Sequence, residues 1–144
     1  MLCAFELFEH LFDPLAFLQS AHRLLKSGRI LLFTTLNDLG FDIQVRWGRS
    51  KSVSPPHHLN FANPFNIDLL MQRAGFELID VGTPGVLDWD IGDRAWRDED
   101  VDPGRLIRSI STFGAPEAKV ALQEWITTHR FGSHMRVIAR KVSG

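Results

Sequence analysis

The chain of 144 residues has the length of one ordinary domain and can bury a core of its own. Its hydrophobic content of 44%, with 11 Phe and 4 Trp, indicates a packed globular body and excludes a disordered segment. Its net charge of −1 argues against a general attraction to nucleic acids or anionic membranes, so we expect neither as a partner.

Cysteine usage and hydropathy set further limits. The single cysteine, Cys3, excludes an internal disulfide and a cysteine-rich metal site, and its apolar neighbours predict a buried strand residue. We find neither an apolar stretch long enough to span a membrane nor a signal sequence. The expected location is therefore the cytoplasm.

Residues 1–37 have the pattern of a strand, an acid-rich turn, a helix and a second strand. We expect the helix to begin at about Pro14, because Asp13 can accept hydrogen bonds from the free amides of the first turn. Gly28 can take the left-handed conformation that closes a helix, and the apolar residues 29–35 form the next strand. These elements make up a βαβ unit.

The following segment, residues 38–61, shows no clear periodicity and is predicted to be a loop. A structureless segment of this length inside a domain is usually functional or mobile. Because it leaves the carboxyl end of a strand, where open α/β sheets bind their ligands, it is a candidate substrate loop.

The second half alternates helices with strands. Asn63 and Asp102, each followed by Pro, are expected to cap helices in the same way as Asp13, and a fourth helix follows Pro116. Strands are predicted over residues 76–81 and 134–142. The acid-rich segment 88–102 is expected to be a second, solvated loop, with at most a short helix, and Trp125 to pack in the core.

Several of these stretches resemble class I S-adenosylmethionine-dependent methyltransferases. The motif is an acidic residue and His, then Asp-Pro, then a stretch close to R-x-L-K-x-G-G-x-L, then a Gly-Phe before a strand, and a terminal strand. The matching stretches are residues 5–14, 23–32, 34–37, 74–77 and 133–141. The resemblance implies a single domain over residues 1–144, equivalent to the C-terminal portion of the family's domain.

The fold class that this resemblance implies is α/β, with a partial Rossmann-like sheet. The strand order would be 4-5-7-6 in the family's numbering, with the last strand antiparallel. The family's glycine-rich turn and its acidic residue for the cofactor ribose belong to earlier strands, and this sequence contains no G-x-G. We therefore expect a truncated site, and a first strand with an open edge that favours self-association.

The residues after the first strand are the candidates for chemistry. The spacing of Glu6, Glu9 and His10, with His58 or His57 from the next loop, is similar to the metal site of some methyltransferases. Mixed oxygen and nitrogen ligands suit a divalent cation such as Mg²⁺, which would lower the pKa of a bound hydroxyl. The alternative is that the Glu-His pair caps the helix or orients a loop on the cofactor side.

The resemblance also assigns cofactor and catalytic residues. By motif position, Ala4 and Phe5 would contact the methionine part of S-adenosylmethionine, or they are ordinary strand residues. Without a metal, Glu9 or His10 would be the base that deprotonates the methyl acceptor.

The expected function is thus part of a methyltransferase that acts on a small molecule or a sugar, inactive as this chain alone. The alternative is a free-standing methyltransferase-derived module for binding or subunit association. The sequence does not name the methyl acceptor.

Overall fold

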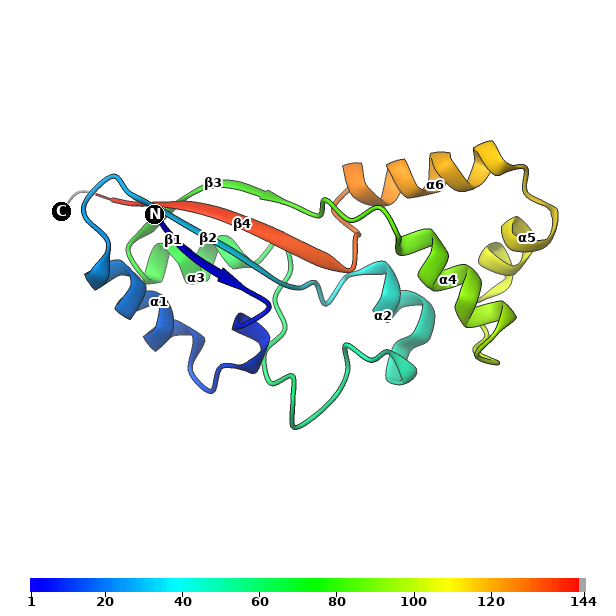
Figure 1. Cartoon of the computed structure of the whole chain (residues 1–144), viewed down its shortest axis with the longest axis horizontal. Coiled ribbons are helices and arrows are strands. Elements are labelled where there is room, and N and C mark those ends of the chain that lie inside the picture. Colours follow the sequence, from blue (N-terminus) through cyan, green and yellow to red (C-terminus); the bar gives the residue numbers. More distant parts are fainter. Residues whose placement is uncertain (143–144) are drawn as a thin grey trace.

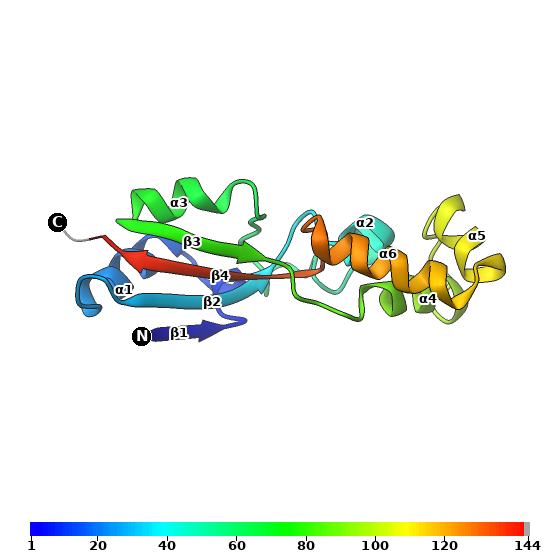
Figure 2. The same ribbon diagram turned by 90° about the horizontal axis from the view of Figure 1, so that it is seen from above.

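A four-stranded mixed sheet forms one end of the molecule in the computed structural model, which describes residues 1–142 (Figure 1). Strands β1 (Leu2–Phe5) and β2 (Ile30–Leu36) are parallel, and β4 (His134–Lys141) lies antiparallel between β2 and β3 (Phe76–Gly82). Figure 2 shows the resulting order, β1-β2-β4-β3. This is the predicted 4-5-7-6 arrangement with its last strand antiparallel, so the predicted fold class is confirmed.

Helices α1 (Pro14–Leu24) and α3 (Ile67–Arg73) lie on the same side of the sheet, below the strands in Figure 1. Helix α1 begins at Pro14, as predicted, because the Asp13 side chain accepts a hydrogen bond from the amide of Ala16 at 2.9 Å. At its other end, Lys141 Nζ donates to the carbonyls of His22 and Leu25 at 2.7 and 2.8 Å. Strand β4 is thereby fastened to the end of α1.

The main core fills the space between these two helices and the sheet. Phe33 on β2 and Val137 on β4 are fully buried there, and Phe8 stacks on Phe33 with ring centroids 5.3 Å apart. Phe8 belongs to η1 (Phe8–His10), the short helical turn that follows β1.

The opposite face of the sheet carries polar cross-strand pairs, of which Arg136 with Asp80 is one, at 2.9 Å. Cys3 is exposed, so the prediction that it is buried is wrong. Leu2 and Ala4 of β1 pack against the core, and Cys3 alternates with them onto the opposite, polar face of this edge strand.

Helices make up the other end of the molecule (Figure 1). They are α2 (Phe41–Arg46), the turn η2 (Trp47–Arg49), α4 (Asp88–Arg97), α5 (Arg105–Phe113) and α6 (Pro116–Thr128). A second, smaller core joins them, with Phe41, Ala95 and Ile126 among its buried members.

Both predicted loops therefore contain helices. Helix α2 spans only 6 residues, too few to show a periodic apolar stripe, and residues 50–61 remain irregular. In α4 the apolar side chains of Trp89 and Ala95 are buried although the helix is rich in acids.

Two helices begin later than the sequence predicts. The side chains of Asn63 and Asp102 each accept backbone hydrogen bonds within a turn. Helices α3 and α5 start after these turns, at Ile67 and Arg105.

Trp125 is 50% exposed and stacks on Phe131, so its expected burial in the core is wrong. In the described part of the chain, no helix has the length and apolarity needed to cross a bilayer.

Candidate functional site at the carboxyl ends of the parallel strands

The side chains predicted to carry chemistry lie just beyond the carboxyl end of β1, beside that of β2. In open α/β sheets this edge is where ligands bind. Glu6 begins the turn with a φ of 48°, which few residues other than glycine adopt. Its carboxylate accepts a hydrogen bond from Thr34 Oγ1 at 2.7 Å, and its other oxygen lies 3.0 Å from Nδ1 of His134.

Glu9 faces a different set of partners. Its side chain is buried, and its carboxylate accepts a hydrogen bond from Thr35 Oγ1 at 2.7 Å. Its backbone carbonyl accepts from the amides of Leu59 and Asn60 at 2.7 and 3.2 Å. Glu9 therefore anchors the irregular segment 50–61 to η1.

Three histidines surround the exposed side of η1. Nδ1 of His10 lies 2.7 Å from the carbonyl oxygen of His57, and Nδ1 of His58 lies 2.8 Å from that of Ser52. Because a carbonyl only accepts, each Nδ1 carries the proton, and in the neutral ring Nε2 is free. The rings of His10 and His58 are 4.9 Å apart, and Nε2 of His10 is 4.0 Å from Glu9 Oε1.

The four predicted metal ligands are thus divided between two places. Glu9, His10 and His58 are neighbours, whereas Glu6 pairs with His134 instead. Within residues 1–142, no three His, Cys, Asp or Glu side chains are arranged so that they could hold a metal ion. The structure does not support the expected metal centre, because the turn at Glu6 directs its carboxylate toward β4 and the Glu9 carboxylate is engaged by Thr35.

The two predicted cofactor-contacting residues end β1. Ala4 is half-buried and Phe5 is 62% exposed, with Thr34 as its partner in the parallel register. The side of β1 away from β2 has no partner strand in the described chain. Phe5 therefore offers an accessible aromatic surface at the ligand-binding edge of the sheet.

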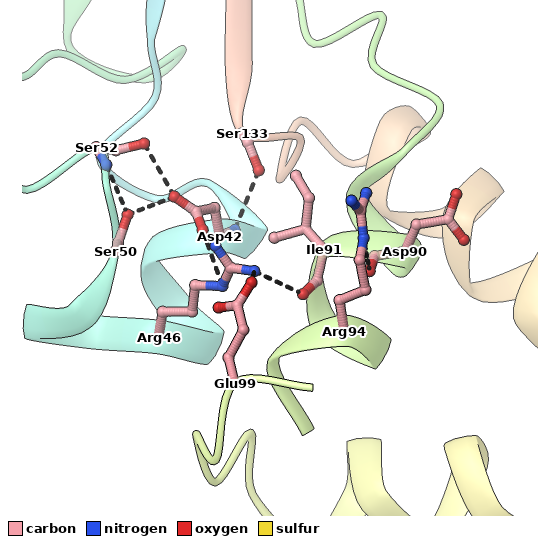
Figure 3. Close-up of polar contacts among 9 residues, drawn as sticks. All are labelled: Asp42, Arg46, Ser50, Ser52, Asp90, Ile91, Arg94, Glu99 and Ser133. Atoms are coloured by element: carbon pink, nitrogen blue, oxygen red, sulfur yellow. Dashed lines mark hydrogen bonds and ion pairs between the residues drawn. The ribbon is translucent and has the colours of Figure 1, made fainter. Parts of the chain in front are cut away.

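A buried polar network lies next to this edge, and sequence reasoning did not identify it (Figure 3). The Asp42 carboxylate accepts hydrogen bonds from the hydroxyls of Ser50 and Ser52, the latter at 2.9 Å. The Asp42 amide donates to the Ser133 hydroxyl at 3.1 Å. This network fixes α2 to the start of β4.

Arg46 extends the network into the acid-rich segment (Figure 3). Its guanidinium donates to the carbonyl of Ile91 at 3.2 Å and to Glu99 at 2.8 Å, and its Nε lies 3.6 Å from Asp42 Oδ1. Asp42 and Arg46 are four residues apart on one helix, and that spacing is the signal in the sequence that indicates the pair. Among the described residues Arg46 contacts Asp42, Ile91 and Glu99, so it ties α2 to the acid-rich segment.

A methyltransferase domain family model matches residues 1–81. A ubiquinone biosynthesis O-methyltransferase of Ruegeria pomeroyi is 30% identical in an alignment 102 residues long that covers 62% of this chain and 40% of that protein. The family match covers more than half of the chain and includes β1, η1, β2 and residues 50–61, whereas β4 lies outside it. The chain therefore belongs to the methyltransferase domain family.

Solved structures agree on the fold. The [4+2]-cyclase SpnF superposes with a TM-score of 0.50 at 17% identity, over 99% of this chain and 49% of that one. A chain from the complex of the Haloferax volcanii Trm112 methyltransferase activator with a putative methyltransferase superposes with a TM-score of 0.55 at 16% identity. The superposition covers 98% of this chain and 53% of that one. The chain thus spans about half the length of these structures, and less of the Ruegeria protein.

Proposed function

We propose that this chain forms part of an S-adenosylmethionine-dependent methyltransferase whose acceptor is a hydroxyl group of a small molecule or a sugar. The observation that carries the proposal is the family match over residues 1–81, which contains β1, η1, α1 and β2. The Ruegeria relative is an O-methyltransferase, which favours oxygen as the acceptor atom.

The residues at the end of β1 fit one side of the cofactor. Phe5 and Leu7 are exposed there, at 62% and 40%, and can pack against an apolar part of a ligand. No glycine-rich turn faces them in this sequence, so these residues do not enclose the group. For this reason we expect the chain by itself to transfer methyl groups poorly.

The cofactor, when bound, supplies an electrophilic methyl group. The chain's own contribution is then to hold the acceptor and remove its proton. Glu9 and His10 remain candidates for the second task, with His10 the more accessible. Residues 50–61, which Glu9 anchors, and α4 border the same edge and are where acceptor selection is expected.

The test is an NMR titration of the chain with S-adenosylhomocysteine, with and without Mg²⁺. We expect shifts confined to residues near 4–10, weaker in Phe5→Ala and unchanged in Phe12→Ala, a matched control because Phe12 is 96% exposed. No shift at millimolar ligand would contradict a cofactor site on this chain. Shifts strengthened by Mg²⁺ would restore the metal hypothesis.

A second candidate function is association, either with another copy or with a protein that completes the sheet. The unpaired edge of β1 and the exposed Phe5 favour it. We expect light scattering to show an increase in mass with concentration that Phe5→Lys abolishes and Phe12→Lys does not. A monodisperse monomer at high concentration would exclude self-association.

A further inference from the structure

A strained and exposed tryptophan ends helix α2. Trp47 has a φ of 47° and a ψ of −125°, close to the first central position of a type II′ turn at about +60° and −120°. Glycine dominates that position because a Cβ is crowded there. The Trp47 side chain is also 76% exposed, so its ring gains little from burial in the described chain. Neither the conformation nor the exposure of this residue stabilises the fold, and such outliers concentrate at functional sites.

Contacts of the surrounding chain hold Trp47 in this conformation. Its amide donates to the carbonyl of Ile43, and its carbonyl accepts from the amide of Ser50 at 3.0 Å. The Ser50 hydroxyl in turn donates to the buried Asp42 carboxylate (Figure 3). A fixed backbone therefore presents the indole ring to solvent.

Trp47 lines an open hollow between two segments that are far apart in the sequence. Residues 45–49 of α2 and η2 form one side, and residues 100–102, which follow α4, form the other. We call this feature the Trp47 hollow. Its volume of about 530 Å³ lies within the range of small-molecule sites, roughly 300–1,000 Å³. Nη1 of Arg49 donates to the carbonyl of Asp100 at 2.9 Å and joins the two sides.

The lining of the Trp47 hollow combines apolar surface with charges of both signs. Val45 and Val101 are buried and supply apolar surface beside the indole ring. The exposed Asp100 has a positive φ of 50°, and its carboxylate has no hydrogen bond or ion pair among residues 1–142. Arg49 uses one nitrogen for the Asp100 carbonyl, and its other N–H groups have no acceptor in the same range. An acceptor and several donors are thus available next to an aromatic face.

We propose that the Trp47 hollow binds a saccharide. The apolar C–H face of a pyranose ring packs on the indole ring. One sugar hydroxyl donates to Asp100 and another accepts from Arg49, because a hydroxyl group can do both. A simple anion would meet the Asp100 carboxylate and a simple cation the Arg49 guanidinium. The mixed charges therefore favour a neutral ligand that is rich in hydroxyl groups.

This site goes beyond the proposed methyl transfer, because its ligand binds without reacting and without a cofactor. A chain that binds glycosides but does not respond to S-adenosylhomocysteine would contradict the proposed function and leave the saccharide site intact. A chain that responds to S-adenosylhomocysteine but binds no glycoside would do the opposite.

The first test is saturation-transfer difference NMR of the whole chain with three probes at millimolar concentration. They are methyl α-D-glucopyranoside, methyl β-D-galactopyranoside and methyl α-L-rhamnopyranoside. We expect transfer from the protein to the ring C–H protons of at least one glycoside. Trp47→Ala should weaken its binding about tenfold, and Trp47→Phe should restore part of it. Phe113→Ala is the matched control, because Phe113 is an 86% exposed aromatic outside the hollow, and it should leave binding unchanged.

Two results of this test would overturn the saccharide site. One is the absence of transfer from all three glycosides. The other is binding of tetramethylammonium or inorganic phosphate that is tighter than that of the glycosides and is lost in Trp47→Ala. In that case the hollow would bind a cation or an anion.

The polar contact has its own test. Asp100→Ala should weaken glycoside binding about fivefold, because it removes the carboxylate that accepts from a sugar hydroxyl. Asp98→Ala is the control, since Asp98 is an exposed acid of the same segment that does not line the hollow. Equal binding by the two variants would overturn the role of Asp100 and, with it, the argument for a hydroxyl-rich ligand.

Urea unfolding tests the strain at Trp47 without any ligand. At an ordinary helical position an Ala variant is more stable than a Gly variant. At this φ and ψ the order should be reversed, so Trp47→Gly should unfold at a higher urea concentration than Trp47→Ala. The wild-type chain should not be more stable than Trp47→Gly. A wild-type chain that is clearly more stable would show that the indole ring serves the fold, and would overturn the proposal.

Discussion

The two ends of the molecule are stabilised in different ways. At the sheet end, α1 and α3 cover one face with an apolar core in which Phe33, Met71 and Val137 are fully buried. At the helical end, α2 and α4–α6 share a smaller apolar core, and the buried Asp42–Arg46 network supplements it. The family match ends at residue 81, before α4, so it covers most of the first end and little of the second.

This contrast shows what each kind of interaction requires from the sequence. A sheet end built on apolar periodicity tolerates many exchanges of similar volume. A buried charge network requires particular residues at particular places, because an unpaired buried charge is costly. We therefore expect the helical end to depend on fewer, more specific residues.

Truncation of the sheet core should have the largest effect. Phe33→Ala removes a fully buried ring that stacks on Phe8, and we expect it to lower the free energy of unfolding by about 3–5 kcal/mol. The measurement is urea unfolding followed by circular dichroism. Phe113→Ala, at an 86% exposed position of the helical end, is the control and should change stability by at most about 0.5 kcal/mol.

Arg46→Met should lower the free energy of unfolding by about 3 kcal/mol, because it leaves the buried Asp42 carboxylate without its cation. The double variant Asp42→Asn with Arg46→Met should recover most of that loss in the same unfolding assay. If the single and double variants are equally unstable, charge pairing is not what holds the helical end, and the contrast between the two ends fails.

The junction between the ends gives an intermediate effect. A Cβ at Gly40 would lie 2.7 Å from both the Asn37 carbonyl oxygen and Ser133 Cα, which are backbone atoms that cannot move aside. Gly40→Ala should therefore lower the free energy of unfolding by about 1–3 kcal/mol. Gly48→Ala, where a Cβ meets nothing within 4 Å, serves as the control, and equal melting temperatures for the two variants would contradict the prediction.

The smallest effect concerns pH. Burial, together with the Lys141 ammonium, lowers the pKa of His22 at the sheet end. The unfolded chain then binds a proton below about pH 6.5 that the folded chain resists, so stability falls as the pH drops through that value. His22→Gln should flatten the stability curve slightly between pH 7.5 and 5.5, and an unchanged slope would contradict this assignment.

The helical end should respond to acid in a lower range. Burial alone would raise the pKa of Asp93, but hydrogen bonds from Ser111 and Arg97 lower it below its ordinary value. The stabilisation from this carboxylate is present above the unfolded pKa of about 3.9 and is lost as the pH falls toward the folded value. Asp93→Asn should remove this loss of stability at acid pH, measured by acid unfolding, and should leave the stability near pH 6.5 unchanged.

Much of the sheet end could be predicted from the sequence. Asp13 and Pro14 mark the start of α1 by local chemistry, and the resemblance to methyltransferases supplied the strand order. Helix α2 could not be predicted, since its 6 residues are too few for a periodic pattern. The exposure of Cys3 depends on β1 being an edge strand, which no local pattern reveals.

The site was predictable only where its residues are close in sequence or in motif. Glu9, His10 and His58, which the resemblance grouped with Glu6, are neighbours in the structure. It could not show that Glu6 turns away from them, because that depends on a single φ angle and on a partner, His134, from the other end of the chain.

The central position of β4 has a consequence for biosynthesis. This strand is the last of the four to leave the ribosome, yet it lies between β2 and β3 and pairs with both. Until it arrives, β2 and β3 have no contact through the sheet, and the edges that β4 will occupy are open to other chains. The nascent protein is therefore most vulnerable to wrong pairing until β4 has left the ribosome, and a chaperone would help most in that interval.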